Sequence, residues 1–89
     1  MTRIIWDKGF EKSYRQRIRI LPAVRNEFFY ALELFAEDPF HPALRTHPLT
    51  GPLEGLWAFS CTSDIRVIFQ FIRKTEVLLV DIGSHEEVY

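Results

Sequence analysis

The sequence contains a single cysteine, Cys61, and none of its apolar runs approaches the about 20 residues that a membrane-spanning helix requires. One cysteine excludes an internal disulfide and a cysteine-rich zinc site, so neither explains the fold. Glycine and proline are also few, with four and five residues in 89, and most lie between positions 39 and 55. They do not divide the chain. We expect one domain, residues 1–89, located in the cytoplasm with no membrane partner.

An excess of charge of one sign is also absent, because 11 lysines and arginines face 12 aspartates and glutamates. A net charge of −1 gives no general argument for a polyanionic partner. The distribution is uneven, however. Residues 1–26 hold seven cations and two acids, a local charge of +5, and the remainder sums to −6. The basic first third predicts either a phosphate-facing surface or a solvated helix face.

Aromatic residues make up 15% of the sequence and hydrophobic residues 47%, which excludes a disordered chain. A short β-prone run, Thr2 to Trp6, precedes Asp7, which is a suitable helix N-cap because its carboxylate accepts a free backbone N–H. Phe10, Tyr14 and Ile18 then recur every four residues and predict an amphipathic helix. Its basic residues lie mostly off that face.

A second helix is expected from Leu21-Pro22 to Asp38-Pro39, because proline suits a first helical turn and disfavours helix in the residue before it. The two helices then form a helical hairpin. Three runs rich in β-branched and aromatic residues follow, and they predict antiparallel strands. These runs are Leu56 to Cys61, Ile65 to Ile72 and Val77 to Ile82.

The order β-α-α-β-β-β predicts an α+β fold, a small and mostly antiparallel sheet with the helical hairpin on one face. Arg66 and Gln70 alternate with apolar residues along their strand, so both point away from the core. The sequence therefore predicts an open face of the sheet, with a groove beside Arg66.

Three motifs occur in order along the second half of the chain. H-P-L-x-G-x-L-x-G spans His47 to Gly55, D-x-R-V-I-F spans Asp64 to Phe69, and D-I-G-S-H-E-E-V-Y spans Asp81 to Tyr89. With these motifs the sequence resembles the RelE/ParE superfamily of toxins from bacterial type II toxin–antitoxin modules, and most closely its YafQ-like mRNA endonucleases. The resemblance covers almost the whole chain, and it implies the same RelE-like β-α-α-β-β-β topology.

The resemblance implies a set of catalytic residues. The histidine of the H-P-L loop falls on His47, the acid at the strand entry on Asp64, the carboxy-terminal histidine on His85 and the terminal aromatic on Tyr89. Many relatives have an arginine on the central strand, where this chain has Arg66.

This chain departs from the resemblance at two points. Ser60 stands where YafQ-like enzymes have a further histidine, and the total charge is slightly acidic where many relatives are basic.

The chemistry implied by the resemblance needs no metal and no cofactor. An RNA 2′-hydroxyl attacks the adjacent phosphorus, which requires a base, a cation beside the phosphorane and an acid for the leaving oxygen. His47 or Asp64 is the expected base, and which of them acts is open. Arg66 is expected to hold the phosphate and protonated His85 to act as the acid. Tyr89 is expected to stack on a base or to orient the phosphate.

Each candidate also has a structural interpretation. His47 is a possible loop cap, and Asp64 a possible turn residue. Arg66 is a possible partner of Asp81 on a neighbouring strand. His41 adds another histidine, but the spacing matches no known zinc motif, and we expect no metal site.

The resemblance implies a ribosome-dependent mRNA endonuclease toxin whose partners are a cognate antitoxin and ribosome-bound mRNA. We expect the toxin to be a monomer within a larger toxin–antitoxin complex. Lys12, Arg15 and Arg19 are the expected contacts to RNA or the ribosome. Two other functions remain open, a ParE-like poison of DNA gyrase and a degenerate, non-catalytic module that binds the antitoxin.

Overall fold

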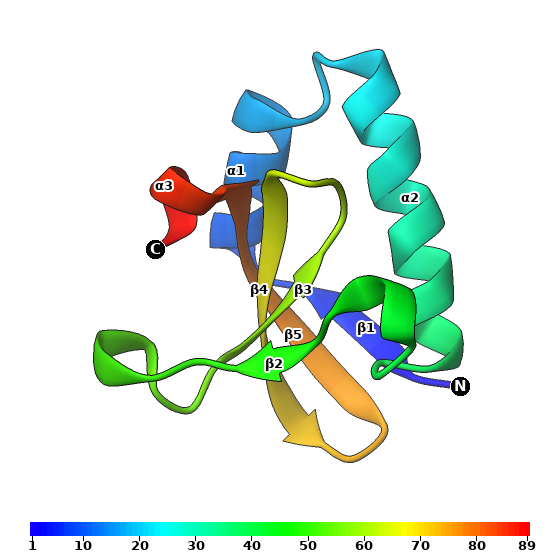
Figure 1. The fold of residues 1–89 in the computed structure, drawn as a ribbon, viewed down its shortest axis with the longest axis vertical. Coiled ribbons are helices and arrows are strands. Elements are labelled where there is room, and N and C mark those ends of the chain that lie inside the picture. The colour runs from blue at the N-terminus through cyan, green and yellow to red at the C-terminus, as the bar shows by residue number, and fades with distance from the viewer.

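The computed structural model describes residues 1–89 and shows one five-stranded sheet with helices packed against it (Figure 1). The strand order is β1-β5-β4-β3-β2; β1 runs parallel to β5, and the other neighbours are antiparallel. The elements are β1 (Arg3–Trp6), α1 (Lys8–Arg17), α2 (Pro22–Glu37), β2 (His47–Pro48), β3 (Trp57–Ser60), β4 (Ile65–Arg73), β5 (Glu76–Ser84) and α3 (His85–Val88). The predicted α+β class and mostly antiparallel sheet are confirmed.

Both long helices begin where the sequence predicts, and α2 also ends there; α1 ends at Arg17, with Ile18 as its C-cap. Asp7 is the N-cap of α1, and its carboxylate accepts the backbone N–H of Gly9 at 2.9 Å. Pro22 opens α2, where its missing N–H costs nothing. The helix stops before Pro39, with Asp38 in extended conformation.

The hydrophobic core lies between the two helices and one face of the sheet. The apolar residues of α1 and α2 that recur at helical spacing meet those of β3, β4 and β5 that recur at every second position. Aromatic rings provide much of this contact, and the ring of Phe35 stacks on that of Phe59 with centroids 4.5 Å apart. The largest fully buried side chains include Phe10, Phe28, Phe35, Phe59 and Phe69.

The opposite face of the sheet is less open than the sequence predicts. Gln70 is exposed there, as expected, but Ala58 and Ile68 are almost fully buried. These two residues are cross-strand partners, and they alternate with the core residues Phe59 and Phe69. The C-terminal helix α3 contacts both β4 and β5.

Two short elements were not predicted. β2 consists only of His47 and Pro48, which pair with Ala58 and Trp57 of β3. The expected glycine turn at the C-terminus is wrong, because Gly83 continues β5 and the chain then enters α3. None of the helices combines the length and the apolar composition needed to cross a lipid bilayer.

Candidate functional site

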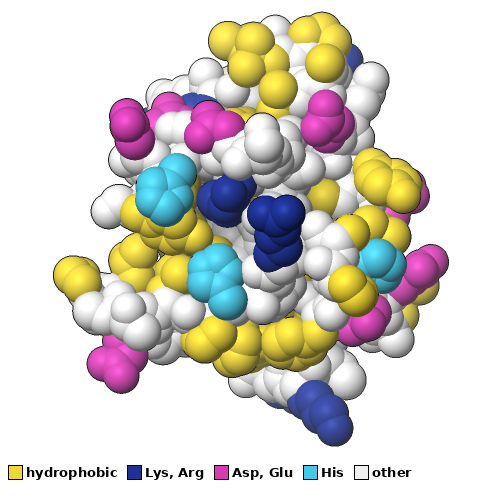
Figure 2. Space-filling view, viewed as in Figure 1, with side chains coloured by type: hydrophobic (Ala, Val, Ile, Leu, Met, Phe, Trp, Pro, Cys, Tyr) yellow, Lys and Arg dark blue, Asp and Glu magenta, His cyan; other side chains and the backbone are white.

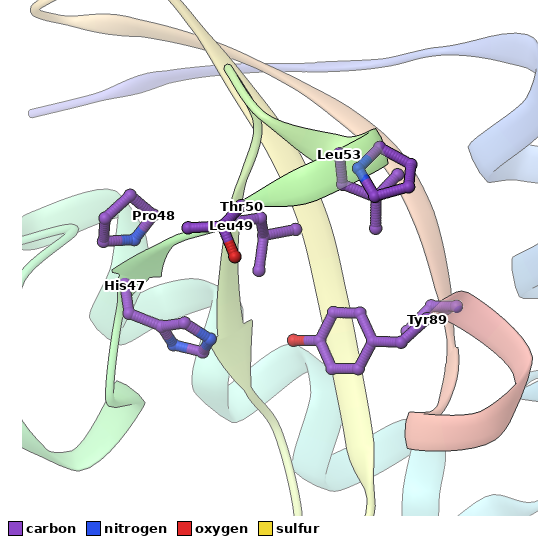
Figure 3. Close-up of a pocket in the computed structure, with 8 residues that line it drawn as sticks. His47, Pro48, Leu49, Thr50, Leu53 and Tyr89 are labelled. Atoms are coloured by element: carbon purple, nitrogen blue, oxygen red, sulfur yellow. The ribbon is translucent and has the colours of Figure 1, made fainter.

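A cleft of about 450 Å³ opens between the loop that follows β2 and the C-terminal end of the chain. In Figure 3 the side chain of Tyr89 points across this cleft, with its phenol oxygen toward the ring of His47. Leu49, Leu53 and Val88 add apolar walls. We call this the His47 cleft. It brings together two residues that are 42 positions apart in the sequence.

The loop on one side of the His47 cleft closes on itself. The backbone N–H of Leu49 donates to the carbonyl of Leu56 at 2.9 Å, so the eight residues between β2 and β3 form a compact turn. Gly51 and Gly55 have φ angles of 64° and 96°, a region that glycine adopts without strain. The conformation holds Leu53 in the cleft wall.

His47 has one ring nitrogen fixed and the other free. Its Nδ1 atom lies 2.8 Å from the carbonyl oxygen of Arg45. A carbonyl oxygen only accepts hydrogen bonds, so Nδ1 carries the proton and donates it. In the neutral ring Nε2 then keeps its lone pair and is able to accept a proton. The expected loop-capping contact of His47 and a base function are therefore compatible in one side chain.

Tyr89 is held in place although it is the last residue of the chain. Its backbone N–H donates to the carbonyl of His85 at 3.1 Å, which closes the turn of α3. The two rings also pack edge to face, with centroids 4.5 Å apart at 77°. Tyr89 is 44% exposed, and partial burial raises the pKa of its phenol while the positive charge of Arg66 opposes that shift. His85 itself is exposed, and it packs against Tyr89 without lining the His47 cleft.

The short helix α3 is stabilised by a capping box. The Ser84 hydroxyl accepts the backbone N–H of Glu87 at 3.3 Å, and the Glu87 carboxylate accepts the backbone N–H of Ser84 at 2.7 Å. The hydrogen bond from the Ser84 backbone is the main reason why the pKa of Glu87 is lowered. The pattern S-x-x-E is visible in the sequence and would have predicted this helix start.

Arg17 of α1 connects the C-terminal helix to the sheet. Its Nη1 donates to the carbonyl of Ile82 at 3.0 Å and lies 3.4 Å from the Asp81 carboxylate, while its Nε lies 3.5 Å from Glu87. Gly83 permits this approach, because a Cβ there would come within 2.9 Å of the guanidinium and 2.8 Å of the Glu87 carboxylate. Sequence reasoning missed Arg17, since its partners are 64 and more residues away.

Arg66 is half-buried and fixed by the turn between β3 and β4. Its guanidinium donates to the carbonyls of Thr62, Ile65 and Ser63 at 3.1, 3.2 and 3.1 Å. The expected alternative, a pair with Asp81, is wrong, because Asp81 is bound by α1 instead. Three of the five N–H donors of an arginine are used, so two stay available for a ligand.

A second cleft of about 330 Å³ has Arg66 in its wall, as the predicted groove does. Arg45 lines it as well, together with Ser60, Cys61, Thr62 and Ser63. We call this the arginine cleft. The segment from Arg45 to His47 contributes to both clefts, because Arg45 lines one and His47 lines the other.

Asp64 lies apart from the other candidates. It is exposed at the end of the turn between β3 and β4 and lines neither cleft. Its carboxylate makes no hydrogen bond or ion pair; the Thr62 hydroxyl, not Asp64, closes the turn by accepting the backbone N–H groups of Asp64 and Ile65. Of the two expected bases, only His47 lies in a cleft.

Two further side chains, Cys61 and His41, belong to types that act as nucleophiles or bind metal ions. Burial raises the pKa of the Cys61 thiol to about 12, so this thiol is protonated at neutral pH. His41 is the N-cap of a 3-10 turn, and its Nδ1 accepts the backbone N–H of Ala43. No three histidine, cysteine, aspartate or glutamate side chains come close enough to hold a metal ion.

The basic residues expected to contact RNA lie away from both clefts. Lys12, Arg15 and Arg19 are exposed on α1 and the turn after it, and only Arg15 has a partner, with Glu11 at 4.0 Å. The face seen in Figure 2 has basic and histidine side chains of its own near the centre, while acidic side chains lie toward its rim.

Several proteins of known structure share this fold. No protein-family model and no curated protein matches the sequence. Among solved structures, the YoeB/ParE toxin from Agrobacterium tumefaciens superposes with a TM-score of 0.76 at 15% identity, over 94% of this chain and 99% of that one. The E. coli DinJ–YafQ toxin–antitoxin complex matches with a TM-score of 0.72 at 19% identity, over 100% and 99%.

This chain has the fold of the RelE/ParE-superfamily toxins. A metal-bound toxin from Helicobacter pylori has the same fold, with a TM-score of 0.71 at 25% identity over the full length of both chains. The topology expected from the resemblance is therefore confirmed.

Proposed function

We propose that this protein is the toxin of a type II toxin–antitoxin system and that it cleaves mRNA on the ribosome. The observation that carries the proposal is His47, whose Nδ1–H is fixed on the Arg45 carbonyl while its other nitrogen is free beside the cleft that Tyr89 closes. A base with a defined tautomer, an arginine with unused donors and a second histidine are the groups that RNA cleavage by 2′-hydroxyl attack needs.

The reaction divides among three side chains. Nε2 of His47 accepts the proton of the 2′-hydroxyl, whose oxygen then bonds to the adjacent phosphorus. The free N–H donors of Arg66 stabilise the negative charge of the phosphorane. Protonated His85 donates to the 5′-oxygen as the bond from phosphorus to that oxygen breaks. The products are a 2′,3′-cyclic phosphate and a free 5′-hydroxyl.

Tyr89 and Asp64 transfer no proton in this scheme. The edge-to-face contact of Tyr89 with His85 fixes the orientation of the imidazole. We propose that the Tyr89 hydroxyl, which points toward His47, orients the phosphate. The ring of His85 packs on Tyr89 of the His47 cleft, whereas the Asp64 carboxylate makes no hydrogen bond or ion pair and lines neither cleft. We therefore propose no proton transfer for Asp64.

Two partners follow from the proposal. A solved relative of the same fold forms a toxin–antitoxin complex, DinJ–YafQ, and we propose that a cognate antitoxin binds this chain. Ribosome-bound mRNA is the proposed substrate. The exposed cations Lys12, Arg15 and Arg19 are the proposed ribosome contacts, because exposed positive charge on α1 attracts RNA phosphates at long range.

The test is primer extension on a defined message with purified ribosomes, with three samples. These are the wild type, the His85→Ala variant and the wild type without ribosomes. We expect cleavage only by the wild type on ribosomes. Growth arrest without cleavage would instead support a gyrase poison, and neither arrest nor cleavage would support a non-catalytic module.

A further inference from the structure

The short helix α3 begins with His85 and is followed directly by Tyr89, but little within the helix holds it in place. It comprises four residues, about one turn, and a helix this short is not stable by itself. None of its residues is buried, so apolar packing does not fix its direction. Contacts to neighbouring elements must therefore set the position of the His85 ring. In Figure 1 the helix α1 lies beside α3 at the end of β5.

Arg17 of α1 joins α3 to the sheet. Its Nη1 donates to the Ile82 carbonyl at 3.0 Å, and its Nε lies 3.5 Å from Oε2 of Glu87. Ile82 belongs to β5 and Glu87 to α3, so one guanidinium contacts the segments on both sides of Gly83 and Ser84. The other carboxylate oxygen of Glu87 accepts the Ser84 backbone N–H at 2.7 Å. Arg17 thus holds α3 through the same carboxylate that caps the helix.

Asp81 and Ser13 fix the guanidinium in turn. Oδ1 of Asp81 lies 3.4 Å from Nη1 of Arg17, and it also accepts the Ser13 hydroxyl at 2.7 Å and the Ile82 backbone N–H at 2.9 Å. Ser13 and Arg17 are four positions apart, so they lie on one face of α1. Polar contacts therefore run without a break from α1 to α3. We call the side chains of Ser13, Arg17, Asp81 and Glu87 the Arg17 network.

The packing at Gly83 shows how closely α3 is held. A Cβ atom there would lie 2.8 Å from Oε1 of Glu87, 2.9 Å from Nη1 of Arg17 and 3.0 Å from Cβ of Glu87. The Cβ of Glu87 is bonded to the helix backbone and moves only when α3 moves. Since no side chain fits between the end of β5 and the Arg17 network, the separation of α3 from the sheet is defined.

The Arg17 network is better suited to positioning than to stability. The side chains of Arg17, Asp81 and Glu87 are 30%, 32% and 43% exposed. Ion pairs this accessible to water contribute about 1 kcal/mol or less to stability. Catalysis is far more sensitive to geometry, because a displacement of about 1 Å costs about 100-fold in rate.

We propose that Arg17 is a positioning residue for His85, the proposed proton donor, and that Ser13 and Asp81 orient Arg17 for this purpose. The inference rests on the proposed function and names the residues that place its acid. Arg17 acts through Glu87, which lies two positions after His85 in the same turn. Loss of Arg17 leaves every reacting group present but moves the imidazole out of line with the leaving oxygen.

The experiment uses a leaving group that needs no acid. Single-turnover cleavage on ribosomes is measured with two messages, one natural and one with sulfur in place of the 5′-oxygen at the cleavage site that primer extension identifies. In the sulfur message the 2′-oxygen bonds to phosphorus, the P–S bond breaks, and its electron pair leaves on a thiolate that requires no proton. The variant is Arg17→Met. The matched control is Arg3→Met, because Arg3 pairs with Glu76 at 3.5 Å at the opposite end of β5.

We expect Arg17→Met to cleave the natural message about tenfold more slowly than the wild type and the sulfur message less than about twofold more slowly. His85→Ala should show the same selective recovery with sulfur. His47→Ala lacks the base and should stay slow on both messages. Arg3→Met should change either rate by less than about twofold.

Asp81→Asn is a second variant with a smaller change of shape. It keeps an oxygen that accepts the Ser13 hydroxyl and removes the charge that faces Arg17. We expect cleavage of the natural message to fall by about threefold, again with recovery on sulfur. The double variant Arg17→Met/Asp81→Asn should be no slower than Arg17→Met alone, because both residues act through one path.

Equal losses on the two messages would show that Arg17 is merely structural, and that result, or no loss on the natural message, would overturn the proposal. If the wild type cleaves neither message, the proposed function fails, and residual dipolar couplings then test the positioning separately. A changed orientation of α3 in Arg17→Met but not in Arg3→Met would keep Arg17 as the residue that places His85. An unchanged orientation would overturn it.

Discussion

The two faces of the sheet differ in the kind of side chain they present, although the same strands build both. On the helix side, Val67 and Phe69 of β4 are fully buried in the aromatic core. On the other side, Arg66 of the same strand has its charge fixed on turn carbonyls at the edge of a cleft. The alternation of a β-strand thus places core residues and a cleft residue on opposite faces within four consecutive positions, 66–69.

The separation predicts that core substitutions unfold the protein and cleft substitutions leave it folded. The largest effect on stability is expected for Phe35→Ala, because Phe35 is 0% exposed and its ring contacts those of Phe59 and Phe69. The loss of buried area and the resulting cavity should cost about 3–5 kcal/mol of the unfolding free energy. Urea denaturation followed by circular dichroism measures this, and a cost under about 1 kcal/mol would show that the site collapses around the smaller residue.

The largest effect on activity is expected for His47→Ala. Loss of a general base lowers the cleavage rate about 10²–10⁴-fold. The ring is exposed and its only hydrogen bond is local, so the melting temperature should stay close to that of the wild type. Single-turnover cleavage on ribosomes gives the rate; a variant that cleaves at the wild-type rate would transfer the base function to another group.

Arg17→Met tests whether α1, on the helix side of the sheet, also holds α3 in position beside the His47 cleft. Its contacts to Asp81, Ile82 and Glu87 are half-exposed, so the loss of stability should be about 1 kcal/mol or less. We expect cleavage to fall more than stability does, about tenfold, because α3 loses its attachment to α1. Arg17→Lys should recover part of the rate. Proportional losses of both would show that Arg17 is only structural.

A smaller effect is expected from pH on the same helix. The pKa of Glu87 is below its ordinary value of 4.5, mainly because the Ser84 backbone N–H donates to the carboxylate. Its stabilising contribution is therefore present above pH 4.5 and is lost as the pH falls through the lowered pKa. Proton NMR should show the contact between the His85 and Tyr89 rings weakening in acid. In Glu87→Gln the contact should lack this dependence, and an identical titration in that variant would contradict the assignment.

A last prediction concerns Cys61, which packs against the core and also lines the arginine cleft. A pKa raised from 9.0 to about 12 lowers the thiolate population at neutral pH, so labelling by iodoacetamide should be on the order of 1,000-fold slower than for an unfolded control. The rate should rise with pH beyond 9, the ordinary value. Labelling as fast as in the unfolded chain would mean that the thiol is solvated.

Periodicity predicts the elements that are long enough to show it. The four-residue spacing of Phe10 and Tyr14 and the two-residue spacing of Val67 and Phe69 both identify core faces correctly. β2 has only two residues, one of them a proline, and therefore no pattern. α3 has four, and its start is indicated only by the capping box.

The site is predictable only in part, for a related reason. Local motifs place His47 and Tyr89 in the candidate set, and the fold brings them to one cleft. Asp64 belongs to the same set but lies in neither cleft, because it occupies the end of a turn rather than a strand face. The contacts of Arg17 and the second cleft beside Arg45 depend on residues far apart in sequence, which no local pattern shows.

The most direct test of the account is the chemical nature of the ends left on a ribosome-bound message. If His47 activates a 2′-hydroxyl, the upstream fragment from the wild type ends in a 2′,3′-cyclic phosphate and the downstream fragment begins with a 5′-hydroxyl. That result is the one we predict, and His47→Ala should yield neither fragment. A 3′-hydroxyl with a 5′-phosphate would contradict the account, because those ends require attack by water rather than by the RNA itself.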